Sequence, residues 1–143
     1  MKRFAVALAA LTMAAPAFAE GVTTYTTDAS FEDAAFAVES AIVGRGLVVD
    51  YVSHVGAMLN RTGEDVGSDT QLFEAADVFL FCSAVTSRSV MEADLMNIAH
   101  CPYGIFVADT GSEVMVGFRN YPEGAMQEVQ SLLDEIAQEA VGK

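Results

Sequence analysis

The sequence predicts an α+β domain in which helices and a mixed sheet form a two-layer sandwich. Short β-prone runs alternate with amphipathic segments in the order β-α-β-(α)-β-α-β-β-α. Turn-forming residues separate the last two expected strands, and 52% of the 143 residues are hydrophobic, which suffices for a buried core. We expect one domain over residues 20–143, preceded by a signal peptide over residues 1–19.

The first expected elements are a strand, a helix and a second strand. Val22–Thr27 is rich in Thr, Val and Tyr, which favour a strand. Ser30 stands where a helix N-cap is expected, and apolar residues then recur at steps of four, three and four up to Gly44. The β-prone run Leu47–Val52 follows, so it predicts the second strand.

The middle of the chain has a weaker pattern. We expect a short helix within His54–Gly63 and a polar loop over Gly63–Thr70. The continuous apolar run Val78–Cys82 is typical of a strand that is buried on both faces. Ser83–Asp94 is then expected to form a helix.

The last third of the chain predicts a hairpin and a helix. Pro102–Ala108 and Val114–Phe118 are the expected strands, and Asp109–Ser112 supplies the residue types of a tight turn between them. The final helix is expected to begin near Pro122, because proline suits the first helical turn. Its apolar residues recur at steps of three and four as far as Ala140.

The N-terminus has the three parts of a secretory signal peptide. Lys2 and Arg3 provide the positive charge, Phe4–Ala15 is almost wholly apolar, and Ala17–Ala19 places small residues at the cleavage site. The apolar run is shorter than the roughly 20 residues that a bilayer-spanning helix needs. We therefore expect cleavage after Ala19 and a periplasmic protein.

Charge excludes some classes of partner. The chain has 7 basic and 20 acidic residues, a net charge of −13, and loss of the leader with its two basic residues brings it to −15. Phosphate binding requires clustered Lys and Arg, so nucleic acid is not expected as a partner. The same charge repels anionic membranes once the signal peptide has been removed.

Known catalytic fingerprints are missing from the sequence. It contains no Gly-x-Ser-x-Gly, no Gly-x-x-x-x-Gly-Lys and no Gly-x-Gly-x-x-Gly. Adjacent acidic residues do not face each other on a helix, and such side chains are usually solvated. The balance is therefore against an enzyme, and we assign no catalytic residue.

Two cysteines, Cys82 and Cys101, allow several interpretations. In an oxidising compartment a small domain with two cysteines favours one disulfide. If their strands ran parallel with a helix between them, the two residues would lie at opposite edges of the sheet, whereas a bridge needs Cα atoms within about 7 Å. Free thiols, an intermolecular bridge and ligation of a metal or haem therefore stay open.

Histidine, methionine and cysteine together suggest a ligand site. His54 and Met58 are four residues apart, which places them on one face of a helix, and this pair suits haem or copper. His100 precedes Cys101-Pro102, a dipeptide through which some proteins offer a thiolate to haem iron. We expect His54 and Met58 to bind a cofactor, with His54, Cys82, Cys101 and His100 as candidate metal ligands. Alternatively, Met58 belongs to the core and His54 to the surface.

A longer pattern extends around the cysteines. It comprises Phe81-Cys82-Ser83-Ala84, Ser87-Arg88, Met91-Glu92-Ala93-Asp94, Asn97-Ile98 and Cys101-Pro102-Tyr103. This pattern resembles the signature of the family named domain of unknown function 302, and Ser53-His54-Val55-Gly56 resembles its exported members. The resemblance implies a compact α+β domain that forms homodimers, and it implies no activity.

Two hypotheses follow. In the first, the protein is a periplasmic binding or electron-transfer accessory protein that holds non-covalent haem or a soft metal through His54 and sulfur ligands. In the second, it is a non-catalytic dimeric interaction module with a structural disulfide, which docks a periplasmic protein partner. Thiol-disulfide exchange is disfavoured, because the cysteines do not form a Cys-x-x-Cys motif.

Export is directly testable. When the full chain is expressed in a bacterium, the protein recovered from the periplasm should have an intact mass that begins at Glu20, because signal peptidase cleaves after the small residues that end at Ala19. A product that keeps Lys2 and Arg3 would contradict both the location and the oxidising environment assumed for the cysteines.

Overall fold

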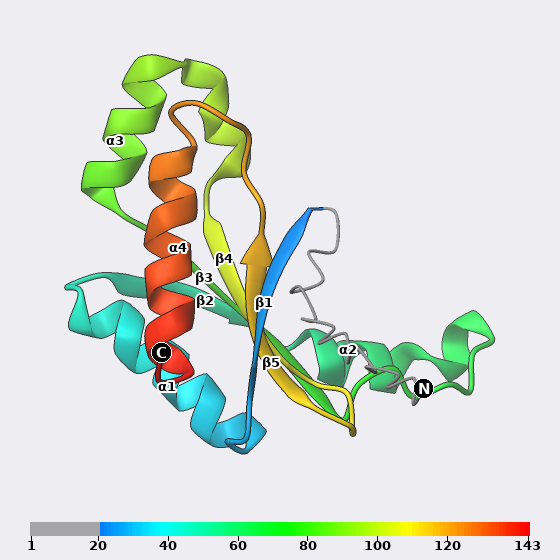
Figure 1. Ribbon diagram of the computed structural model, residues 1–143. Coiled ribbons are helices and arrows are strands. Elements are labelled where there is room, and N and C mark those ends of the chain that lie inside the picture. Colours follow the sequence, from blue (N-terminus) through cyan, green and yellow to red (C-terminus); the bar gives the residue numbers. More distant parts are fainter. Residues whose placement is uncertain (1–20) are drawn as a thin grey trace, which may run out of the picture.

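The computed structural model describes residues 21–143 and forms a two-layer α+β sandwich. The expected signal peptide, residues 1–19, lies outside the described residues. Figure 1 shows α1 and α4 on one side of the sheet, α3 beside the first turns of α4, and α2 projecting away from them. The predicted fold class is thereby confirmed.

Five strands and four α-helices, with two short 3-10 helices, make up the domain. The strands are β1 (Val22–Thr27), β2 (Val48–Ser53), β3 (Ala75–Cys82), β4 (Tyr103–Asp109) and β5 (Val114–Arg119). The helices are α1 (Phe31–Gly44), α2 (Val55–Thr62), η1 (Glu64–Val66), α3 (Ala84–Ala93), η2 (Leu95–His100) and α4 (Gln127–Ala140). Across residues 21–143, none of these helices has the length and apolar character that a membrane span requires.

The sheet is antiparallel throughout, in the order β1-β5-β4-β3-β2. The expected mixed sheet was therefore wrong. Parallel neighbours need a crossover that returns the chain to the same end of the sheet. Here α2 and α3 instead connect strands that run in opposite directions, and α1 carries the chain from edge strand β1 to edge strand β2.

Some element boundaries differ from the sequence expectations. β3 begins at Ala75, ahead of the expected Val78, because β4 offers partners as far as Asp109. The last helix begins at Gln127 instead of near Pro122, since Gly124 adopts a positive φ of 92° that ends any helical turn before it. The short helix η2 was not predicted.

The core lies between the helices and one face of the sheet. Strand residues alternate between the two faces, so only every second residue points toward α1 and α4. The fully buried large side chains of the core are Val38 and Ile42 of α1, Val90 of α3, Val129, Leu133 and Ile136 of α4, and Phe81, Tyr103, Ile105, Val107, Val116 and Phe118 of the sheet. Apolar packing of two helices on one sheet face therefore holds the domain together.

The first turn of α2 packs directly on β3 at Gly56. A Cβ atom at Gly56 would lie 2.5 Å from the backbone nitrogen of Ala76, closer than real Cβ contacts occur. Only glycine allows the helix to approach the strand this closely. The contact fixes the direction in which the chain leaves β2, and so the position of His54 just before the helix.

Substituting Gly56 should weaken the fold. We expect Gly56→Ala to lower the free energy of unfolding by about 1–3 kcal/mol, because the added methyl group overpacks against the β3 backbone. Urea denaturation measures the change. Gly44→Ala is the matched control, since a Cβ at Gly44 meets nothing within 4 Å. Equal stability of the two variants would contradict the close packing of α2.

Candidate functional site

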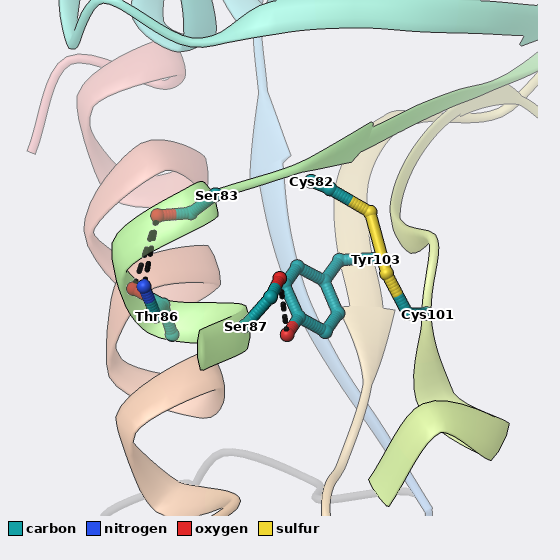
Figure 2. The surroundings of a disulfide bond; sticks show 6 residues. All are labelled: Cys82, Ser83, Thr86, Ser87, Cys101 and Tyr103. Atoms are coloured by element: carbon teal, nitrogen blue, oxygen red, sulfur yellow. Dashed lines mark hydrogen bonds between the residues drawn. A yellow bond between two sulfur atoms is a disulfide. The ribbon is translucent and has the colours of Figure 1, made fainter. Parts of the chain in front are cut away.

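The two cysteines form a disulfide between the end of β3 and the start of β4. These strands are antiparallel, with Phe81 opposite Tyr103, so Cys82 and Cys101 lie next to each other with Cα atoms 6.8 Å apart. Figure 2 shows the bridge beside the first turns of α3. The geometric objection to a bridge applied only to parallel strands, and the antiparallel return removes it.

The residues around the disulfide cap a helix and fix its packing. The Ser83 hydroxyl accepts the Thr86 backbone N–H at 3.2 Å and so caps α3. The Ser87 hydroxyl and the Tyr103 phenol hydrogen-bond at 3.0 Å, which ties α3 to β4 (Figure 2). The residues of the sequence pattern around the cysteines therefore have a structural role: they connect the end of β3, the start of α3 and the start of β4, a region that we call the corner.

The disulfide removes both cysteines from the set of available ligands. A bridged sulfur has no thiolate with which to bind a metal or haem iron. Arg88 also does not approach the sulfurs to stabilise a thiolate, because its Nε donates to Glu92 Oε1 at 2.8 Å in an exposed ion pair. The oxidised protein offers only histidine and methionine as soft or borderline donors.

His100 lies near the disulfide and packs against aromatic residues. Its ring meets the Tyr121 ring edge-on, with centroids 5.6 Å apart, and Tyr121 in turn contacts the Tyr103 ring at 6.2 Å. Burial raises the pKa of Tyr121, and within residues 21–143 the Tyr121 hydroxyl has no hydrogen-bond partner. His100 thus belongs to an aromatic cluster at the corner.

His54 occupies a different part of the molecule, between β2 and α2. Its Nδ1 lies 2.8 Å from Oδ1 of Asp77 on β3, and its side chain is 67% exposed while that of Asp77 is 17% exposed. A carboxylate accepts hydrogen bonds, so the neutral imidazole donates from Nδ1 and has its lone pair on Nε2. The imidazole is therefore oriented and open to solvent.

The candidate ligands do not converge on one point. His54 lies beside Asp77, five residues along β3 from Cys82, which at about 3.3 Å per residue separates them by roughly 16 Å. Among residues 21–143 no three His, Cys, Asp or Glu side chains are grouped to hold a metal ion. Met58 alone stays near His54, since its N–H donates to the His54 carbonyl at 3.1 Å.

Sequence reasoning missed Asp77, the residue that holds the imidazole. Asp77 directly precedes the apolar run Val78–Cys82. An acidic residue inside a β-prone segment is unusual, because strands are depleted in aspartate, and this was a usable indication. Which histidine it would contact depends on the antiparallel pairing of β2 with β3, which the sequence does not specify.

The side of the sheet that faces away from α1 and α4 carries a largely apolar surface. We call it the outer face and define it by Val48, Tyr51, Val78, Leu80, Phe106 and Met115. Val48 is 70% exposed and Tyr51 is 64% exposed, while the others are half-buried. The expectation that the β3 run is buried on both faces was therefore wrong, because only its alternate residues reach the core.

The outer face is almost free of charge. The Phe106 ring lies across Gly117, where a Cβ would come within 2.5 Å of Cζ. None of the strand positions in the regular alternation of this face holds Asp or Glu, although the chain has 20 acidic residues. Arg119 stands at its corner, and Asp50 falls in the bulge of β2, outside the alternation.

Comparison with known proteins places this fold in a family. The model of the family described as domain of unknown function DUF302 matches residues 23–143. The chain belongs to the DUF302 family. A DUF302 protein from Bacillus stearothermophilus has a crystal structure that is similar with a TM-score of 0.69 and 14% sequence identity, over 85% of this chain and 99% of that one. No curated protein matches the chain.

This DUF302 domain should depend on its disulfide for stability. Replacing both cysteines, Cys82→Ala with Cys101→Ala, should lower the free energy of unfolding by about 3 kcal/mol, because the bridge closes a loop with a sequence separation of 19. Guanidinium denaturation measures it, and reduced wild type should match the variant. A variant as stable as oxidised wild type would show that the bridge does not restrain the chain.

Proposed function

We propose that this DUF302 protein is a non-catalytic interaction module that works as a homodimer, with the disulfide as a structural support. The outer face is the observation that carries the proposal. Its apolar residues extend over four of the five strands, β2 to β5, and contiguous exposed apolar patches of this kind mark interaction sites.

The distribution of charge selects a second copy as the occupant. Two chains of net charge −15 repel each other wherever their carboxylates meet. Apart from Asp50 in the bulge of β2, the strands of the outer face bring no carboxylate of one copy against the other, so few like charges oppose the apolar contact. A twofold arrangement of this face against itself satisfies the self-complementarity that a dimer requires.

The dimensions of the outer face suit a compact interface. At about 4.8 Å between strands and about 3.3 Å per residue, five strands of this length cover roughly 20 Å by 20 Å. This footprint is about 400 Å² on each copy and about 800 Å² in total, below the roughly 1,200 Å² at which stable interfaces begin, so we expect a weak dimer whose apolar centre contributes most of the affinity. Phe106 and Leu80 occupy that centre, because β4 and β3 are inner strands.

The ligand-binding hypothesis keeps part of its support. With the cysteines bridged, haem or copper binding rests on His54 and Met58, and electron transfer would need a redox centre held by these two side chains. His54 is supported by its bond to Asp77, which leaves Nε2 free. Binding at His54 and association through the outer face are compatible, since they use different side chains.

Disrupting the outer face should separate the dimer. We expect Tyr51→Glu to raise the dimer dissociation constant at least about 100-fold, because a buried carboxylate costs about 2 kcal/mol and the twofold axis counts it twice. Tyr51 is largely exposed in the single chain, so the fold should not change. Light scattering after size-exclusion chromatography, over a range of concentrations, measures the mass.

Val85→Glu is the matched control. Val85 is 80% exposed on α3, away from the outer face, and the variant should remain as dimeric as wild type. A wild-type mass of one chain at every concentration would refute the homodimer. If Tyr51→Glu and Val85→Glu shift the measured mass from dimer toward monomer to the same extent, the outer face is not the interface.

A further inference from the structure

His54 is a fixed nitrogen donor. Its position is set by three elements, since it directly follows β2, is the N-cap residue of α2 and hydrogen-bonds to Asp77 of β3. The glycine contact between Gly56 and Ala76 prevents α2 from drifting away from the strand. A carboxylate on the far ring nitrogen is the arrangement that orients metal-binding histidines.

Met58 supplies a soft donor one helical turn away. It is 41% exposed, and its sulfur lies 3.8 Å from the Thr62 hydroxyl, a weak contact. His54 is the N-cap residue of α2, and its carbonyl accepts the Met58 N–H at 3.1 Å, so the two residues are one helical turn apart along the backbone. The thioether is unbranched with three rotatable bonds, so ion binding at His54 requires the Met58 sulfur to turn away from Thr62 toward the imidazole.

This pair of donors favours a particular class of ion. A thioether sulfur is soft, and imidazole is a borderline ligand, whereas Mg²⁺ and Ca²⁺ prefer oxygen. The Asp77 carboxylate is occupied by the imidazole ring and acts on the ion only through it. Two donors of this kind satisfy a monovalent ion with a filled d shell, which accepts two-coordinate geometry.

We propose that His54 Nε2 and Met58 Sδ form a surface site for a soft monovalent cation of the Cu(I) class, with Asp77 as the positioning residue. The site uses neither the outer face nor the disulfide. It therefore stands apart from the proposed dimer, and each proposal fails separately.

Ag(I) is the probe for this site, because it has the same soft character and is not oxidised. The disulfide-intact mature protein is titrated with silver nitrate in buffer free of chloride and thiols, by calorimetry and by NMR of the methionine methyl groups. We expect one ion per chain and a shift of the Met58 methyl signal. His54→Ala and Met58→Leu should each weaken binding at least about 10-fold.

Met96→Leu is the matched control. Met96 is 71% exposed and lies four residues before His100, but in a 3-10 helix such residues do not share a face. It should bind as wild type does. Undiminished binding in Met58→Leu, or loss in Met96→Leu instead, would overturn the proposal.

Asp77→Asn tests the positioning role. We expect about 10-fold weaker Ag(I) binding and, in long-range proton–nitrogen spectra, loss of the single Nδ1–H tautomer of His54. Binding and tautomer both unchanged would exclude that role. Haemin titration tests the alternative that His54 binds haem. Haem binding that is lost in His54→Ala but kept in Met58→Leu would identify the ligand as haem iron and would contradict the soft-cation site. Light scattering of the same samples reports the dimer independently.

Discussion

Antiparallel pairing of β3 with β4 is the constraint on which the rest of the structure depends. It sets Phe81 opposite Tyr103, and it turns the chain so that Cys82 meets Cys101 after the excursion through α3 and η2. The same pairing aligns the alternate residues of both strands into one core face and one outer face. The disulfide then closes the corner that the pairing has already formed.

The Cys82–Cys101 disulfide and the His54 imidazole lie near opposite ends of strand β3. β3 runs from the neighbourhood of His54 at Asp77 to the disulfide at Cys82, so residues that look like a common ligand set in sequence lie at opposite ends of the sheet. Each end then has its own chemistry. One end is a covalent and aromatic support, and the other is an exposed, oriented nitrogen donor.

Charge and apolar surface are distributed differently in this domain. Most acidic residues lie on helices, loops and strand ends, and of the two inside strands, Asp77 alternates onto the side of the core and Asp50 falls in the bulge of β2. An acidic chain with one apolar surface that carries little charge keeps its solubility and can still associate through that surface. This distribution connects the composition of the chain with the interaction that we propose for it.

The sequence by itself determined much of the local structure. Periodicity and capping predicted α1 with its Ser30 cap, which accepts the Asp33 N–H at 3.1 Å, and the hairpin of β4 and β5. The α+β class followed from the order of these elements, and the cysteine pattern identified the DUF302 family. These properties depend on interactions within a few residues or on motif matching, so a linear pattern contains them.

Only the tertiary structure decided which distant residues meet. Because β3 and β4 are antiparallel, Cys82 and Cys101 form a disulfide and cannot act as thiolate ligands. The tertiary structure also places His54 next to Asp77 and His100 next to Tyr121. It also showed that the β3 run is buried on one face, because α1 and α4 cover a single side of the sheet. Such contacts depend on the pairing of strands far apart in sequence, and local propensity does not determine that pairing.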